Sequence, residues 1–493
     1  MNAIRTQGDP ILQQPCEPVS AQDVDLAAEA EACHEALALF RAEHGFGRAI
    51  AAPQLGFAKR FVCLNLGATP FTVINPEITW RSEEKFEVWD DCLSLPDIVV
   101  RVERHRSISL TYVDDRGRRR TWERLPEDMS ELLQHEIDHL DGILMTQRAA
   151  GSDAVRPISE HADLVGAERR EHRLSLPAIA RAAEAVDPVF LHSPQFESES
   201  LSAELACSLT LKVETVNPIR CFKGRGADYF VADLVQRGDE RPLVCASAGN
   251  FGQAMAYACG KHGRPLTVFA ATTANTLKIE RMKALGAEVR LAGRDFDAAK
   301  DAAREFAQQR GALWVEDGRE PAISEGAGSL AVELLARDDA FDDLLVPLGN
   351  GALLAGVGRW FRAASPATRI VGVCSTGADA MARSWREGRI VQGDSVRTIA
   401  DGIGVRVPVP EALADLEGLI DDVVLVDDEA ILRAMRLIFD HTGLLTEPAA
   451  AVGVAVPLTD TRFVGSRVAT ILTGGNMTVE ETESRLFRRR IER

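Results

Sequence analysis

The sequence predicts two folded domains in one chain: an α+β domain over residues 1–148 and an α/β domain with parallel sheets over residues 174–493. The length of 493 residues is enough for about three structural units. Residues 1–148 alternate short β-like runs with turn signals and end in a helical pattern, whereas the second region repeats a buried strand followed by a helix. Residues 149–173 are small, polar and charged, with little apolar periodicity, and we interpret them as a linker or a surface helix.

Local patterns predict the individual elements. In the first domain, strands are expected at 61–66, 98–102 and 107–112, and a helix is expected over 130–140. In the second domain, strands are expected at 242–247, 266–270 and 344–348, each followed by a helix. Such an alternation predicts parallel sheets with glycine-bearing turns at the strand ends, where ligands bind.

Composition excludes several classes of protein. Hydrophobic residues make up 46% and charged residues 26% of the chain, as in folded globular proteins. The net charge of −18 argues against binding to nucleic acid or to an anionic membrane. No run approaches the ~20 apolar residues of a membrane span, and the N-terminus lacks the apolar core of a secretory signal. Nine scattered cysteines do not form a disulfide framework, so we expect a cytoplasmic enzyme.

The sharpest motif of the first domain is QHEIDH at 134–139. On a helix, His135 and His139 are four residues apart and project from one face, where they can hold a divalent metal while Glu136 acts on a water molecule. Cys92 is the candidate third ligand, which leaves a fourth tetrahedral position open, as in catalytic sites. The alternatives are two solvated histidines and a buried cysteine that acts only as a small hydrophobic residue.

Together with these residues, GDPIL at 8–12, GRAIAAPQLG at 47–56 and DDCLS at 90–94 make residues 1–148 resemble the peptide deformylase family. The resemblance implies a metallohydrolase with Cys92, His135 and His139 as ligands of iron(II) or, as an alternative, zinc. It also implies that Glu136 is the general base and acid, and that Gln54 and the backbone amide of Leu93 stabilise the oxyanion.

Two residues depart from the deformylase pattern. Ala49 replaces the second glycine of its motif, and Asp91 replaces the glycine before the metal cysteine. Asp91 adds a carboxylate near the substrate cleft, which would either disfavour an acidic substrate or recruit a cation. The sequence leaves both alternatives open.

The second domain carries a reactive-lysine motif and three glycine-containing loops. Lys223 lies in FKGRGA at 222–227, and the loops are SAGNFGQ at 247–253, GNGAL at 349–353 and TGGN at 473–476. Pyridoxal phosphate chemistry requires such parts: a lysine for the Schiff base, backbone N–H groups for the phosphate, an asparagine for the phenolic oxygen and a hydroxyl for the ring nitrogen. Any single loop is more simply explained as an ordinary strand-to-helix turn.

With KIERMKALGAEV at 278–289, ADGI at 400–403 and EPA at 447–449, residues 174–493 resemble the fold-type II pyridoxal phosphate enzymes, the tryptophan synthase β family, and especially its threonine/serine dehydratases. The resemblance implies a two-lobed α/β fold and a homodimer formed through this domain. The residue roles that it implies are Schiff-base formation by Lys223, phenolic-oxygen binding by Asn250, phosphate binding by Gly349, Asn350, Gly351 and Ala352, ring-nitrogen contact by Thr473, and substrate carboxylate binding by Ser247 and Ala248.

Four residues depart from the dehydratase pattern, and they weaken the assignment of the substrate more than that of the cofactor. Phe251 stands where histidine is usual and Cys221 where serine is usual, and Asn350 and Ala352 interrupt the glycine run.

The two domains suggest one function. A formylated amine cannot form a Schiff base, so we expect a bifunctional enzyme that deformylates an N-formyl amino acid and then eliminates the β-substituent of the freed amino acid, giving a 2-oxo acid and ammonia. The alternative is a β-replacement synthase whose deformylase-like domain is a non-catalytic scaffold or acts on a separate substrate. In either case the partner is a small amino-acid substrate.

Overall fold

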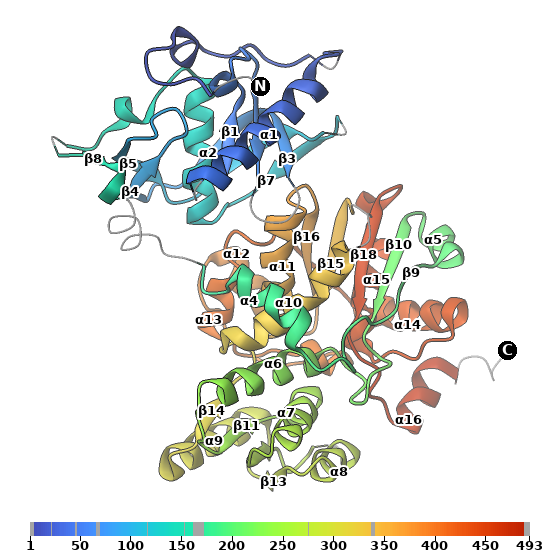
Figure 1. Ribbon diagram of the computed structural model, residues 1–493. Helices are drawn as coiled ribbons and strands as arrows, with labels where there is room; N and C mark the ends of the chain where they lie inside the picture. Colours follow the sequence, from blue (N-terminus) through green and yellow to red (C-terminus); the bar gives the residue numbers. More distant parts are fainter. Residues whose placement is uncertain are drawn as a thin grey trace. The chain divides into compact units, whose positions relative to one another are not determined.

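The computed structural model describes residues 4–20, 22–44, 47–65, 70–115, 117–151, 153–160, 172–274, 276–336 and 341–487. The chain forms two compact units, one of residues 1–172 with 363–367 and the other of residues 173–362 with 368–493 (Figure 1). Within the predicted linker 149–173, residues 161–171 lie outside the described residues. Its first part contains a strand, β8 (Val155–Pro157), which pairs with β5 (Ile98–His105), so regular structure of the first unit continues beyond residue 148.

The described residues of the first unit form two antiparallel sheets and two longer helices. The three-stranded sheet has the order β4-β5-β8, with β4 at Lys85–Asp91. The five-stranded sheet has the order β1-β2-β3-β6-β7, and its strands are Ala49–Ala51, Phe61–Leu64, Phe71–Arg81, Ile108–Val113 and Arg119–Trp122. The helices are α1 (Leu26–His44) and α2 (Glu127–Leu140), with 3-10 turns at Pro10–Gln13, Ala52–Leu55, Met145–Arg148 and Ile158–Glu160.

Side-chain alternation along the strands explains why the five-stranded sheet has helices packed on both faces. Ile50, Phe61 and Cys63 belong to the buried cluster that contains residues of α1, whereas Ala51 and Val62 belong to the cluster that contains residues of α2. The expected strands and the helix at 130–140 correspond to β2, β5, β6 and α2, with shifted ends. We did not predict α1 from the sequence, although its Ala, Leu and Glu residues are strong helix formers.

The second unit contains two further sheets. The six-stranded sheet has the order β17-β16-β15-β18-β10-β9, and only the β9–β10 pair is antiparallel. The four-stranded sheet, β13-β12-β11-β14, is entirely parallel. In chain order from β9 to β18, the strands are Gln195–Glu197, Ser208–Val213, Leu243–Ala246, Leu266–Ala270, Glu288–Leu291, Leu313–Val315, Asp343–Pro347, Arg369–Ser375, Asp422–Val426 and Arg467–Leu472.

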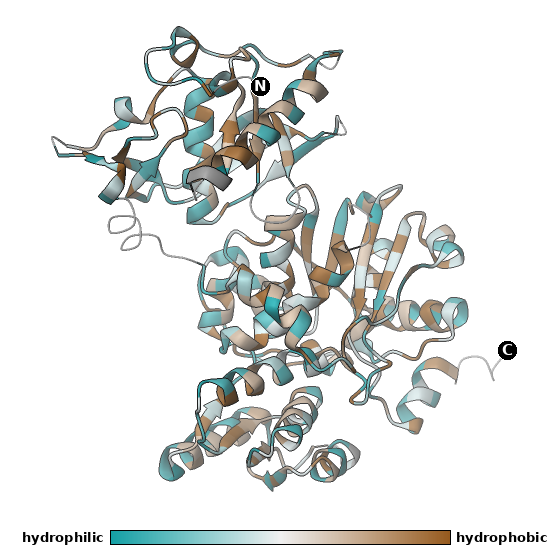
Figure 2. Cartoon of the chain, in the orientation of Figure 1, coloured by the Kyte–Doolittle hydropathy of each residue, from teal (hydrophilic) through white to brown (hydrophobic). Residues whose placement is uncertain are grey.

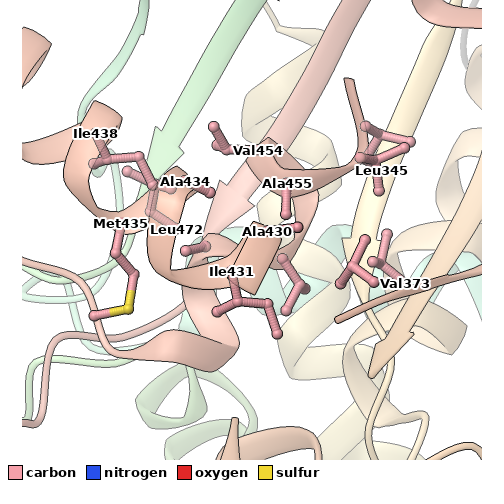
Figure 3. Close-up of a cluster of buried hydrophobic side chains, with 14 of the residues drawn as sticks. Leu345, Val373, Ala430, Ile431, Ala434, Met435, Ile438, Val454, Ala455 and Leu472 are labelled. Atoms are coloured by element: carbon pink, nitrogen blue, oxygen red, sulfur yellow. The ribbon is translucent and has the colours of Figure 1, made fainter. Parts of the chain in front are cut away.

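Helices cover both faces of the six-stranded sheet. On one face, Leu345, Val373 and Leu472 pack against α14 and α15 (Figure 3). Hydrophobic residues recur along the strands of this sheet in Figure 2. From α4 to α16, the helices are Leu176–Ala185, Glu199–Leu205, Lys223–Gln236, Asn250–Lys261, Thr276–Ala284, Phe296–Arg310, Pro321–Leu335, Ala352–Ala364, Ala380–Glu387, Pro410–Asp415, Asp428–Thr442, Pro448–Thr459 and Val479–Thr482.

Three shorter helical segments are found among the described residues of the second unit, at Asp401–Ile403, Thr461–Phe463 and Glu483–Phe487. Within the described ranges, no helix has both the length and the apolar character that crossing a membrane requires.

Candidate active sites

The first unit brings together the three predicted metal ligands. Cys92 follows β4, and His135 and His139 lie on α2. Their ligand atoms lie within 4.8 Å of one another, and all three side chains are buried. The Cys92 Sγ atom is 3.2 Å from Nε2 of His139. One thiolate and two imidazoles in this arrangement form a donor set suited to zinc or iron(II).

Asp90 orients one of these histidines. Nδ1 of His135 donates to Oδ2 of Asp90 over 3.1 Å, which leaves Nε2 of the ring for a metal. Arg104 holds Asp90 in turn, since its Nη2 donates to the same oxygen over 2.7 Å and its Nη1 donates to Asp138 over 2.5 Å. We assigned no role to Asp90 from the sequence, although a carboxylate two residues before a candidate ligand was a usable signal.

Glu136 and Gln54 lie buried in the same region. Oε2 of Glu136 has no hydrogen-bond partner among the described residues. Burial raises the pKa of Glu136 to about 7, and the charges of Asp90 and Asp91 act in the same direction. Such a carboxyl can both accept and donate a proton near neutral pH. An unpartnered buried oxygen beside a set of metal ligands fits a site built to hold a metal and a water molecule.

Gln54 is held in place by its own hydrogen bonds. Its Oε1 accepts from the backbone N–H of Ala51 over 2.8 Å, and its Nε2 donates to Oγ of Ser94 over 3.2 Å. The same Nε2 is 3.6 Å from the Cys92 sulfur, so an amide donor lies beside the ligand set. Leu93 follows Cys92 directly, and its side chain is buried in the cluster that contains residues of α1.

The second unit contains a cavity of about 830 Å³ at the carboxyl ends of strands from both of its sheets. This position is the usual one for ligand sites in parallel sheets. The predicted residues that line the cavity are Lys223, Ser247, Ala248, Asn250, Gly349, Asn350, Gly351, Ala352 and Thr473. All of the residues predicted for this site therefore lie around one space.

Lys223 begins α6 and is tied to the loop that carries Thr473. The N–H of Phe222 donates to the carbonyl of Thr473 over 2.9 Å, and the N–H of Gly475 donates to the carbonyl of Arg220 over 3.0 Å. Nζ of Lys223 lies 2.6 Å from Oδ2 of Asp317, which follows β14. The sequence did not point to Asp317, although a carboxylate just after a strand was a signal for a site residue.

Asn250 is partly buried and belongs to a hydrogen-bond network with two buried residues to which the sequence assigned no role. Its Nδ2 donates to Oε1 of Glu447 over 2.7 Å, and Nδ2 of Asn476 donates to its Oδ1 over 2.9 Å. Burial raises the pKa of Glu447 to about 7, and the charge of Asp401 adds to the effect. The network fixes the Asn250 amide at the cavity wall, where its second N–H can serve a ligand.

The loop 349–352 leads from β15 into α11. Gly351 has a φ of +95°, a conformation that favours glycine. Among the described residues, no protein acceptor pairs with the backbone N–H groups of 349–352, and these groups precede or begin α11. Free N–H groups at a helix N-terminus are suited to a phosphate. Oγ of Ser247 accepts from Gly249 and Gly252, which shapes the neighbouring loop.

The second unit matches a known family of enzymes. Residues 186–474 match the family model described as "pyridoxal-phosphate dependent enzyme". The chain belongs to this family. Residues 1–154 match the model described as "polypeptide deformylase", so a deformylase-family domain precedes the pyridoxal-phosphate dependent enzyme in one chain.

Among relatives of the pyridoxal-phosphate dependent unit, L-threonine ammonia-lyase of Geobacter sulfurreducens is 35% identical over 285 residues, which are 57% of this chain and 71% of that protein. The processed form of threonine deaminase isoform 2 from Solanum lycopersicum matches with a TM-score of 0.58 at 28% identity, covering 63% of this chain and 93% of the other. Maize serine racemase matches with a TM-score of 0.60 at 26% identity, covering 65% and 99%. The second unit therefore has the fold-type II architecture and is of the threonine dehydratase type, with pyridoxal phosphate as its cofactor.

Proposed function

We propose that the chain is a bifunctional enzyme that first hydrolyses the formyl group of an N-formyl amino acid and then eliminates the β-substituent of the freed amino acid. The observation that carries the proposal is that the residues of two complementary chemistries lie in one chain, each gathered around its own site. The nitrogen of a formamide is not nucleophilic, so only the deformylated amine can react at Lys223. The first reaction would thus produce the substrate of the second.

At the first site, Cys92, His135 and His139 would hold a divalent metal, iron(II) or zinc, which supplies Lewis acidity and lowers the pKa of water. Glu136 would take a proton from the attacking water and return it to the departing amine, for which a pKa of about 7 is suited. Nε2 of Gln54 and the N–H of Leu93 would donate to the carbonyl oxygen as it gains charge.

At the second site, pyridoxal phosphate supplies an electron sink for negative charge at the α-carbon of the substrate. Residues of the chain would hold the cofactor at three points. Asn250 would bind its phenolic oxygen, residues 349–352 would bind its phosphate, and Thr473 would contact its ring nitrogen. Lys223 would remove the α-proton, and Ser247 with Ala248 would bind the substrate carboxylate. Loss of the β-substituent followed by hydrolysis gives a 2-oxo acid and ammonia.

Two variants separate the reactions. Glu136→Ala should lose formate release from N-formyl amino acids while still forming a 2-oxo acid from the free amino acid. Lys223→Ala should show the reverse pattern, because it lacks the nitrogen that joins the cofactor. The proposal fails for the first domain if metal-loaded wild-type protein releases no formate from any N-formyl amino acid. It fails for the second domain if a product that incorporates an added thiol or amine replaces the 2-oxo acid.

A further inference from the structure

Asp317 places a carboxylate directly beside the reactive nitrogen of the second site. We propose that Asp317 binds a positively charged group on the side chain of the substrate, so that the preferred substrates are amino acids with a cationic side chain and a leaving group on the β-carbon rather than neutral β-hydroxy amino acids. This inference rests on the proposed function of the second site and specifies its substrate class.

The geometry around Asp317 supports this role. Its Oδ2 is 2.6 Å from Nζ of Lys223, and its side chain is only 11% exposed. Among the residues that the structure describes, Lys223 is its only ion-pair partner. A carboxylate removed from water in this way needs a cationic or hydrogen-bonding partner, because an unpaired buried charge is costly.

Lys223 cannot remain that partner when it is joined to the cofactor. A free lysine ammonium offers three N–H donors, whereas the nitrogen that is linked to pyridoxal phosphate offers one at most. Its direction is then set by the cofactor rather than by Asp317. The carboxylate is left at the cavity wall, next to the place where the substrate reacts.

The other cations of the cavity are already paired with other carboxylates. Lys278 lies 2.9 Å from Asp401, Lys300 pairs with Glu316, and Arg406 pairs with Asp297. None of them forms an ion pair with Asp317 among the described residues. While Lys223 is joined to the cofactor, a substrate ammonium is therefore the cation that the site lacks. Once the substrate amine takes its place on the cofactor, Lys223 must act as a base toward the α-proton and does not supply that charge.

Charged groups line the cavity close to Asp317. The cavity of about 830 Å³ also takes the cofactor, and Lys300, Glu316 and Arg406 are among its lining residues. Lys300, Glu316 and Arg406 also line a second cavity of about 480 Å³ with strongly charged walls. A polar side chain that extends past Asp317 meets charged groups rather than an apolar pocket.

Binding of shape-matched amino acids to the cofactor-loaded enzyme tests the proposal. 2,4-Diaminobutyrate and norvaline have side chains of the same length and differ in one terminal group, ammonium or methyl. Dissociation constants are obtained from the change in cofactor absorbance upon titration. Wild-type protein should bind the diamino acid roughly 10- to 100-fold more tightly, the range expected for a hydrogen bond to a charged group. Equal constants for the two ligands would overturn the proposal.

Variants test whether the tighter binding of 2,4-diaminobutyrate depends on the Asp317 carboxylate. Asp317→Asn should bind the two ligands about equally, and Asp317→Glu, which retains the charge, should keep the preference. Asp394→Asn is the matched control, since Asp394 is an exposed carboxylate that lines the same cavity. The control should keep the wild-type preference. A preference that survives in Asp317→Asn would contradict the proposal even if wild-type protein shows it.

Failure of the inference differs from failure of the proposed function. If serine or threonine yields a 2-oxo acid while the matched ligands bind equally, the elimination chemistry stands and only the role of Asp317 is wrong. If no amino acid yields a 2-oxo acid but the diamino acid still binds more tightly, the site takes cationic amino acids for another reaction.

Discussion

Replacing Asp90 by alanine should weaken metal binding at the first site without removing any ligand. Asp90 is 3% exposed and accepts hydrogen bonds from His135 over 3.1 Å and from Arg104 over 2.7 Å. Without it, Nδ1 of His135 loses its acceptor, so the ring is no longer held with Nε2 toward the metal. Loss of such an outer partner typically lowers metal affinity about 10- to 100-fold. This range corresponds to about 1.4–2.7 kcal/mol of binding free energy.

The assay is a competition titration of metal-free protein with zinc and a chelating dye. Glu87→Ala is the matched control, because Glu87 lies on the same strand β4 but its side chain is 56% exposed. The control should keep wild-type affinity. Asp90→Asn retains an acceptor oxygen for His135 and should lose less affinity than Asp90→Ala. Wild-type zinc affinity in folded Asp90→Ala protein would refute the role assigned to Asp90.

Three further predictions concern stability and metal removal. The Arg225 side chain is fully buried and forms ion pairs with Glu214 and Glu333. Arg225→Met should therefore lower the free energy of unfolding by about 3–5 kcal/mol, measured by thermal unfolding. The control is Arg237→Met, because the Arg237 side chain is 72% exposed, and this variant should change the free energy of unfolding by less than about 0.5 kcal/mol. Burial raises the pKa of Glu447 from 4.5 to about 7, so between these pH values the folded state keeps a proton that the unfolded state has lost. Cofactor-free protein should therefore lose stability as pH rises through this range. Glu447→Gln should lack that loss when melting temperatures at pH 5 and pH 8 are compared. Extraction of the metal should abolish formate release, which added iron(II) or zinc restores, and should leave ammonia release from a free amino acid unchanged.

The local sequence pattern was sufficient to predict those helices and strands that have strong hydrophobic periodicity and clear boundaries. The run at 266–270 forms β12 with the expected ends, and the pattern around His135 and His139 lies on α2. Helix α1 was missed because its buried residues, among them Cys33 and Leu37, stand in an alanine-rich segment with little contrast between its faces. Strand β8 is only three residues long and is exposed, so nothing in its composition distinguishes it from a linker.

In the candidate sites too, some residues could be predicted from the local sequence and others could not. The motifs around Lys223 and His135 predicted which side chains gather in space, because those motifs carry their chemistry in a short stretch of sequence. Asp317 and Asp90 were not predicted, since their partners lie 94 and 45 positions away in the chain. Contacts over such separations depend on how strands and helices pack, so the position of each carboxylate next to a motif or after a strand could mark it as a candidate but could not identify its partner.

The most direct test of the coupled function follows formate and ammonia together, in one reaction, from protein loaded with metal and pyridoxal phosphate. The substrates are a panel of N-formyl amino acids that includes formylated serine, threonine and 2,3-diaminopropionate. The account predicts that at least one compound yields both products, with formate appearing first and ammonia absent in the Glu136→Ala variant. Ammonia released from the formylated compound by Glu136→Ala as fast as by wild-type protein, or no formate from any compound, would contradict it.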